Sequence, residues 1–220
     1  MFSGDWHFEL WLAVIVSGLY HGINPGMGWP LAVSAGLMER RPSAVWGALG
    51  PLAFGHFAAM AVVLLPFALL AVLITWSREI QMASAILVIA FGVFRFINRR
   101  HPRALARIKP TQLGLWSFAI AMAHGAGLML VPIYLGLCTT KELSQFGHRA
   151  AAALMTNNIA MAVLVSAIHA IAMIAIGGII AWVVYRYIGL KFLSKSWFNL
   201  DGIWAISLIF VGLLGLWASV

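Results

Sequence analysis

The chain has 220 residues, of which 63% are hydrophobic and 9% are charged, and its mean hydropathy is +0.96. A soluble domain is nearer half apolar and a quarter charged, so this composition excludes an ordinary water-soluble globule and indicates an integral membrane protein. The formal net charge of +8 comes from basic residues between apolar runs, a distribution that sets membrane topology and argues against nucleic-acid binding.

The apolar residues fall into six runs separated by polar or charged segments. Since a transmembrane helix needs about 20 residues, we predict about six spans within a single membrane domain covering residues 1–220. The first, second and fifth runs are too long for one straight helix, so they must tilt, break or add a half-helix at the membrane surface. In the first run Asn24-Pro25-Gly26 marks a break, because proline removes an amide donor and glycine frees the backbone. The runs are residues 10–37, 45–76, 82–97, 113–138, 150–185 and 203–220.

The two halves of the chain carry the same order of motifs. Each half has a His-Gly pair, then Met-x-x-Pro, then His-x-x-x-Met, then a final plain span, and a second break is expected at 124–127. Repeat 1 covers about 8–98 and repeat 2 about 112–220, joined by a basic loop at 99–111. A repeat of three spans enters the membrane from opposite sides in its two copies. The predicted fold is therefore all-α, with two inverted three-helix repeats and discontinuous helices, and an accidental alignment of histidine-rich helices is the alternative.

Positive charge predicts the orientation of the spans in the membrane. With six spans, eleven of the 14 Lys and Arg residues fall on the side of the 99–111 loop, and only Arg78, Lys141 and Arg149 fall on the other. Because the cytoplasmic side carries the excess of Lys and Arg, we place the loop in the cytoplasm and both termini outside.

Four histidines are the only ionisable side chains deep within the predicted spans. Ionisable groups in a bilayer are costly and usually face a cavity or a partner. A lone histidine is better explained by a hydrogen bond to a neighbouring carbonyl, but four histidines in symmetric pairs favour a function. Neutral imidazole binds copper, nickel and zinc, and a thioether prefers Cu(I). Two of the histidines have a methionine one helical turn later. We therefore predict a central site for copper, nickel, cobalt or zinc, built from His21, His56, His124 and His169 with Met60 and Met173.

Two asparagines are candidates for a polar substrate path. Asn24 lies at the break in the first run, where free helix ends bind ions. Asn158 lies eleven residues before His169 and shares its helix face. The alternatives are a kink that only improves packing for Asn24, an interhelical hydrogen bond for Asn158, and ordinary packing for the two methionines.

The plan of six spans in two inverted repeats resembles a group of small bacterial transporters that includes the lysine exporters, the nickel/cobalt efflux proteins and the thiol-disulfide carriers of the cytochrome-biogenesis type. The opening His21-Gly-Ile-Asn-Pro-Gly-Met-Gly-Trp29 also resembles the start of a family of bacterial inner-membrane proteins beside that group. The chain lacks the His-x4-Asp-His signature of the nickel/cobalt proteins, and its one cysteine excludes the pair that the thiol carriers use. The resemblance implies transport without naming the substrate.

We expect a secondary transporter of a transition-metal ion, in which the repeats rock around the central site. No Walker phosphate loop and no His-Glu-x-x-His motif is present, so no nucleotide hydrolysis or peptidase activity is predicted. One alternative is a metal- or haem-binding subunit of a membrane redox complex, with histidines as axial ligands. Another is an organic-solute exporter whose histidines only line a polar cavity. The expected partners are the lipid bilayer, a small ion or solute and, in an assembly, further copies of the chain or other membrane subunits.

Overall fold

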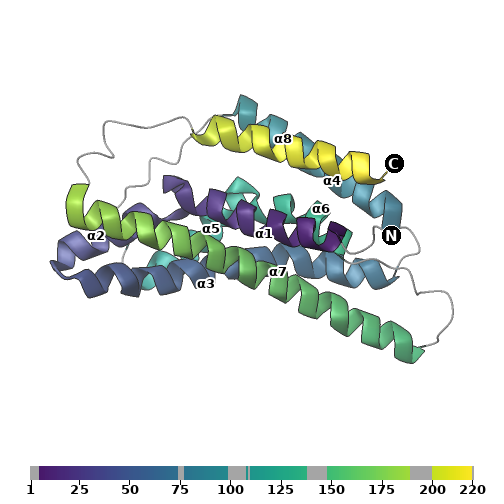
Figure 1. Cartoon of the computed structure of the whole chain (residues 1–220), viewed down its shortest axis with the longest axis horizontal. Coiled ribbons are helices and arrows are strands. Elements are labelled where there is room, and N and C mark those ends of the chain that lie inside the picture. Colours follow the sequence, from purple (N-terminus) through teal and green to yellow (C-terminus); the bar gives the residue numbers. More distant parts are fainter. Residues whose placement is uncertain are drawn as a thin grey trace.

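The computed structural model describes residues 5–73, 77–98, 108, 110–137, 148–188 and 200–219. Every element within those ranges is helical (Figure 1), as the predicted all-α fold requires. The predicted loop at 99–111 lies largely outside the described residues. In chain order the elements are α1 (Asp5–Ile23), the 3-10 turn η1 (Pro25–Met27), α2 (Trp29–Glu39), α3 (Pro42–Leu73), α4 (Ser77–Ile97), the 3-10 turn η2 (Pro110–Gln112), α5 (Leu113–His124), α6 (Ala126–Leu137), α7 (His148–Val183), the π-helical turn η3 (Val184–Ile188) and α8 (Leu200–Ser219).

Two helices are long and apolar enough to cross a membrane by themselves. They are Pro42–Leu69 in α3, with 28 residues, and Asn158–Ile188 in α7 and η3, with 31 residues. The pair α5–α6 makes a third span if it is taken as one helix bent by 65°. Two to three candidate spans are compatible with a membrane protein, and the count of six stays a prediction. The shorter apolar helices within the described residues are Phe8–Ile23, Met82–Ile97 and Ala205–Trp217.

The surface of the described residues carries many large apolar side chains, while the core is also mainly apolar. Large apolar side chains such as Phe54, Leu115 and Trp217 are 70–73% exposed. The buried polar side chains of the described residues are serines, one asparagine and the four predicted histidines. Lipid solvates an apolar surface of this kind, and polar groups that lie inside it must find their partners within the protein.

Both predicted helix breaks are present, and each comes just after a histidine. α1 is followed by Asn24, whose side chain accepts a hydrogen bond of 2.9 Å from the Gly26 amide. Gly28, with φ of 107°, then opens α2. α5 ends at His124, where Gly125, with φ of 69°, turns the chain by 65° into α6. Positive φ disfavours any side chain, so both turns depend on glycine.

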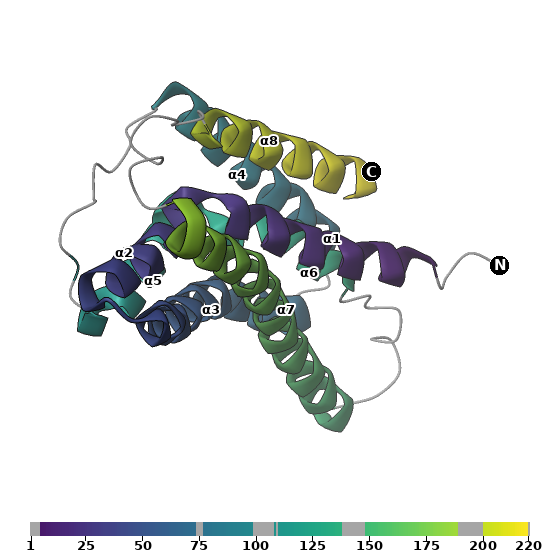
Figure 2. The same cartoon turned by 60° about the vertical axis from the view of Figure 1, so that its left-hand side comes forward.

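The helices form two groups, which Figures 1 and 2 show from two sides. The long helices α3 and α7 pack together with the broken helices α1–α2 and α5–α6, whereas α4 and α8 lie side by side along one flank. Within the larger group, α1 packs on α7 and α5 packs on α3. Each half of the chain therefore lays its broken helix against the long helix of the other half, and α6 connects the flanking pair to this group.

The α4–α8 pair makes the same contacts in both directions. A Cβ atom at Gly92 would lie 3.0 Å from the carbonyl oxygen of Ala205, and one at Gly212 would lie 3.0 Å from the carbonyl oxygen of Ala85. Because the late part of each helix meets the early part of the other, the two helices run antiparallel. Both were predicted only as plain spans, although they share the motif Ala-Ile-x-x-Ile-x-x-Gly at 85–92 and 205–212.

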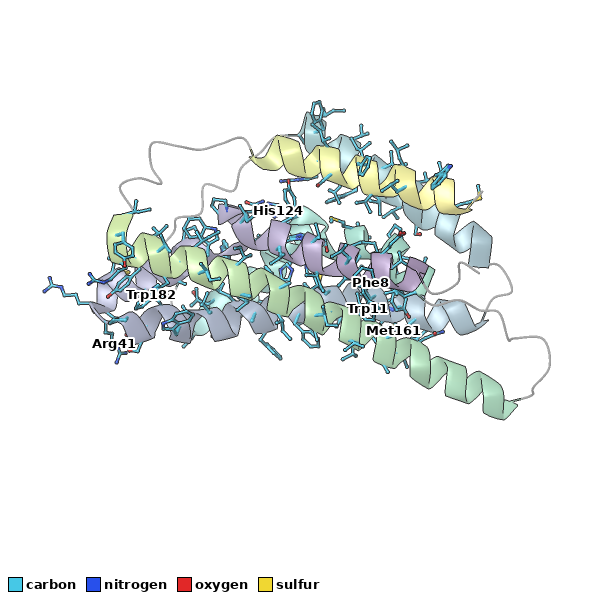
Figure 3. All side chains as sticks on the ribbon, viewed as in Figure 1. Phe8, Trp11, Arg41, His124, Met161 and Trp182 are labelled. Atoms are coloured by element: carbon cyan, nitrogen blue, oxygen red, sulfur yellow. The ribbon has the colours of Figure 1, made fainter. Side chains whose placement is uncertain are left out.

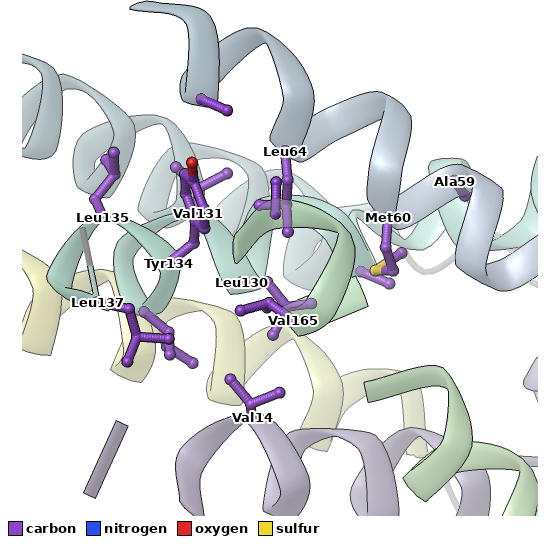
Figure 4. Close-up of a cluster of buried hydrophobic side chains, with 14 of the residues drawn as sticks. Val14, Ala59, Met60, Leu64, Leu130, Val131, Tyr134, Leu135, Leu137 and Val165 are labelled. Carbon is purple, nitrogen blue, oxygen red and sulfur yellow. The ribbon is translucent and has the colours of Figure 1, made fainter. Parts of the chain in front are cut away.

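An apolar cluster joins α1, α3, α6 and α7 (Figure 4). It contains Val14, Met60, Leu130, Tyr134 and Val165, whose side chains are all fully buried. Close packing of this kind fixes the four helices relative to one another. The cluster also takes up Met60, one of the two methionines that the sequence predicts as ligands.

Candidate functional site

Three of the four predicted histidines meet inside the larger helix group. His21 of α1, His56 of α3 and His169 of α7 are each at most 1% exposed. Their ring centres are 4.8 Å apart for His21 and His169, 5.4 Å for His56 and His169, and 5.5 Å for His21 and His56. Three helices from both halves thus supply one imidazole each to a common buried group, which we call the histidine cluster.

Two glycines of α1 permit this approach. A Cβ atom at Gly18 would lie 2.5 Å from the carbonyl oxygen of His169, and one at Gly22 would lie 2.2 Å from the carbonyl oxygen of Met173. Glycines four residues apart form a small-x-x-x-small face, which lets two helix backbones pack closely in a membrane. Since His21 stands between these glycines in the sequence, the contact brings it beside His169.

Hydrogen bonds through Ser17 fix the tautomers of two rings. The carbonyl oxygen of Ser17 accepts a bond of 2.9 Å from His21 Nδ1, which must therefore carry the proton. The Ser17 hydroxyl donates to the carbonyl oxygen of Val14 at 2.8 Å, so it accepts from His169 Nδ1 at 3.0 Å. In the neutral rings Nε2 is then left with a lone pair, the form that binds metal ions. Ser17 was not among the residues predicted from the sequence, although it lies one helical turn before His21.

Two ring nitrogens of the cluster are buried without compensation. The Nε2 atoms of His56 and His169 have no hydrogen-bond partner among the described residues. Leaving a buried polar atom unsatisfied costs about 1–3 kcal/mol, so such atoms in a folded protein call for a functional explanation. A ligand that binds the lone pair of His169 Nε2 and also pairs with His56 Nε2 would remove this cost.

His124, labelled in Figure 3, repeats in the second half the local geometry of His21. Its Nδ1 donates a hydrogen bond of 2.9 Å to the carbonyl oxygen of Ile120, four residues earlier. The Nδ1 of His21 likewise donates to the carbonyl oxygen of Ser17, four residues earlier. Each half thus holds a histidine in one tautomer in the last turns before its helix break.

The ring of His124 lies beside the break of the first half. A Cβ atom at Gly26 would lie 3.2 Å from Asn24 Oδ1 and 3.6 Å from His124 Nε2. Asn24 and His124 are both buried, and His124 is near enough to interact electrostatically with His21 and His56. The structure therefore places Asn24 and His124 together, next to the histidine cluster.

The two predicted methionine ligands have different surroundings. Both are buried, but Met60 belongs to the apolar cluster of Figure 4. Met173 lies outside the three apolar clusters of the described core. Its carbonyl group touches Gly22, which follows His21 directly. Met173 is therefore the methionine that lies at the crossing of α1 and α7.

Asn158 lies away from the histidines. It precedes His169 by eleven residues of α7, which corresponds to about 16 Å along a helix. Its carbonyl oxygen accepts a hydrogen bond of 2.9 Å from the Tyr134 hydroxyl. The structure does not bring this predicted path residue to the histidine cluster.

The rings of the histidine cluster have the spacing of an ion site, but they are not oriented toward a common ion. With metal–nitrogen bonds of about 2.1 Å, the ring centres of two imidazoles on one ion lie about 5 Å apart, close to the observed separations. However, the stacked rings of His56 and His169 are parallel to within 10°, and lone pairs in parallel planes do not meet at one atom. Accordingly, no group of three or more His, Cys, Asp or Glu side chains within the described residues is arranged to hold a metal ion. A shared ion requires one ring to turn about χ2, which is a soft torsion in histidine.

Comparison with known proteins assigns no family. The chain matches no protein-family model, no curated protein and no solved structure. The resemblance to small bacterial transporters stays a prediction, and the function has to be argued from the geometry of the site.

Proposed function

We propose that the chain is a secondary transporter of the bacterial inner membrane and that its cargo is a transition-metal ion bound at the histidine cluster. The observation that carries this proposal is the meeting of three buried imidazoles, drawn from both halves of the chain, beside a helix break. Ionisable groups at membrane depth mark substrate and ion pathways. Discontinuous helices around such a site are typical of secondary transporters. The ions considered are copper, nickel, cobalt and zinc, all of which imidazole binds.

The packing of the two halves supports six spans in two inverted three-helix repeats. α1, α4 and α8 have 19, 21 and 20 residues, about the length of one span each. Six spans result if α1–α2 and α5–α6 each count as one broken span. Equivalent helices of inverted repeats run antiparallel, as α4 and α8 do, and their glycine contacts are reciprocal.

We place the end of the helix bundle that carries Arg41 and Arg186 in the cytoplasm. Figure 3 shows Arg41 at the end opposite Phe8, and in Figure 1 α1 begins and α8 ends at the Phe8 end. The stacked rings of Trp46 and Trp182, 5.8 Å apart, lie near the arginine end, where an aromatic belt would meet the lipid headgroups. Both termini would then lie outside, as the positive charges predict.

The residues of the chain account for binding and release in the following way. Ser17 holds Nδ1 of His21 and His169, so the lone pair of each neutral ring is on Nε2, the atom that would bind the ion. A turn of His56 about χ2 would end its parallel stacking on His169 and leave the bond from His169 to Ser17 in place. A proton and a metal ion compete for the same nitrogen, so protonation of the cluster would favour release. We therefore expect proton-coupled transport.

The two alternatives are favoured less by this geometry. A haem held by two axial histidines would need the thickness of the porphyrin between their rings, whereas the three rings of the cluster pack directly against one another. An exporter of organic solutes would use the histidines only as a polar lining. That use does not explain why Ser17 holds two rings in the tautomer that binds metals.

The metal content of the purified full-length chain tests the proposal. The variants are His56→Ala/His169→Ala and a control, His101→Ala, in the predicted 99–111 loop. After separate loading with copper, nickel, cobalt and zinc, we expect stoichiometric metal in the wild type and the control but none in the double variant. The same ion should cross proteoliposome membranes that contain the wild type. Bound iron with a haem spectrum would favour the redox subunit, and no bound metal in any of these proteins would overturn a metal cargo.

A further inference from the structure

We propose that the histidine cluster selects a soft monovalent cation, Cu(I), and that Met173, not Met60, adds a thioether ligand to it. The inference rests on the proposed function, because it names the charge and the softness of the transported ion. It also separates two methionines that stand at the same spacing from a histidine in the sequence, at His56-x-x-x-Met60 and His169-x-x-x-Met173.

The charge of the surroundings favours a monovalent ion. The buried polar side chains of the described residues are Ser, His and Asn, so they give an ion no negative counter-charge. Ser17 holds the Nδ1 atoms of His21 and His169, so both rings in their neutral form carry the lone pair on Nε2 and add no charge to an ion. The cost of moving an ion from water into a low-dielectric interior grows with the square of its charge, so a divalent ion costs about four times as much as a monovalent one. Neutral donors compensate the smaller cost far more readily.

The donor types favour copper among the transition metals. Imidazole suits zinc, copper, iron and nickel, whereas thioether sulfur selects Cu(I). Copper is therefore the ion that both donor types accept. A site of three imidazoles and one thioether is neutral and partly soft, which matches the monovalent state of copper and not the divalent one.

The assignment to Met173 follows from the crossing of α1 and α7. Met173 stands one turn after His169 on the same helix face. Its carbonyl group meets Gly22 beside His21, and its side chain is buried outside the apolar clusters of the described core. The backbone of Met173 thus lies at the crossing that brings His21 beside His169, and we assign its thioether to the ion on this ground.

Met60 has the same sequence spacing but different neighbours. Its side chain packs in the apolar cluster of α1, α3, α6 and α7 (Figure 4). The close contact between α3 and α5 lies at Gly55 and Gly114. Gly55 is next to His56 in the sequence, but it is more than one helical turn from Met60. Met60 is thus a packing residue, and it provides a matched control for Met173.

The test compares the binding of two classes of ion by the purified full-length chain. Cu(I), kept reduced by anaerobic handling, and the redox-inert Ag(I) represent soft monovalent ions. Zn(II), Ni(II) and Co(II) represent divalent ions. The variants are Met173→Leu, Met60→Leu, Met173→Cys and His169→Ala. Leucine keeps the volume of methionine, and cysteine keeps a soft sulfur.

We expect the wild type to bind Ag(I) and Cu(I) more tightly than any of the three divalent ions. Met173→Leu should weaken the binding of both monovalent ions by more than about 10-fold, the lower limit for loss of an outer-shell partner. Met60→Leu should leave this affinity unchanged, and Met173→Cys should retain it. His169→Ala should abolish the binding of every ion.

Three results would overturn the inference. Tighter binding of Zn(II), Ni(II) or Co(II) than of Ag(I) and Cu(I) would reject the monovalent cargo while leaving metal transport in place. Equal losses in Met60→Leu and Met173→Leu, or no loss in either, would reject the role of Met173. No binding of any ion by a correctly folded wild type would reject both the inference and the proposed function.

Discussion

The two halves of the chain make equivalent contacts in the α4–α8 pair but not at the histidine cluster. In the pair, Gly92 and Gly212 each face an alanine carbonyl oxygen of the other helix. A Cβ atom added at either glycine would lie 3.0 Å from that oxygen. At the site, His21 packs in the histidine cluster, with its ring centre 4.8 Å from that of His169. Its counterpart His124 lies instead beside the Asn24 turn of the other half. The flanking pair is symmetric, and the site is not.

This difference bears on the mechanism that we propose. In alternating access by inverted repeats, the two copies hold different conformations around one site and exchange them during transport. A symmetric pair such as α4–α8 can serve both states without repacking. In the proposed mechanism, the unequal surroundings of His21 and His124 are those of one conformation, and they would be exchanged in the other.

The largest expected effect concerns the close contact that builds the cluster. Gly22→Ala should lower the free energy of unfolding by about 3 kcal/mol, because its Cβ would lie 2.2 Å from the carbonyl oxygen of Met173 and 2.3 Å from Ile176 Cγ2. The control is Gly47→Ala, since a Cβ at that exposed position meets nothing within 4 Å. Alanine there should be neutral or stabilise α3 by up to about 1 kcal/mol. Thermal unfolding in detergent measures both, and equal melting temperatures for the two variants would contradict the contact between α1 and α7.

A smaller effect, equal at two positions, is expected in the flanking pair. Gly92→Ala and Gly212→Ala should each lower the free energy of unfolding by about 1–3 kcal/mol, because both force a Cβ against a neighbouring backbone. The contacts are reciprocal, so the two losses should agree within about 0.5 kcal/mol. Unfolding of both variants under one set of detergent conditions checks this symmetry. A loss confined to one glycine would show that α4 and α8 are not equivalent.

The smallest effect separates the site from the packing around it. Ser17→Ala removes the hydroxyl that accepts from His169 Nδ1, so it should weaken binding of the transported ion by about 10–100-fold, as loss of an outer-shell partner does. The control is Ser117→Ala, which removes a buried hydroxyl that donates to the Leu52 carbonyl oxygen at 2.7 Å. Both variants should lose similar stability, about 1 kcal/mol. Ion titration distinguishes them, and equal affinities would argue against the tautomer role of Ser17.

Much of the helical order could be predicted from the sequence. The run at 82–97 ends where α4 ends, and the run at 113–138 covers α5 and α6. The two breaks were also predictable, since Pro25 with its neighbouring glycine and Gly125 act on the backbone locally. Other local signals were present but missed. Ser17 lies one turn before His21, and the Ala-Ile-x-x-Ile-x-x-Gly motif occurs in both α4 and α8.

The sequence by itself determined which side chains are costly inside a membrane, and it therefore selected the four histidines. Only the tertiary structure decided which of them meet, because helical periodicity fixes the face of a residue within its own helix but not the neighbour of that face. The crossing of α1 on α7, set by Gly18 and Gly22, brings His21 to a residue about 150 positions away in the chain. The same crossing places the backbone of Met173 beside Gly22 and leaves Asn158 three helical turns from His169, since both outcomes depend on where the two helices touch.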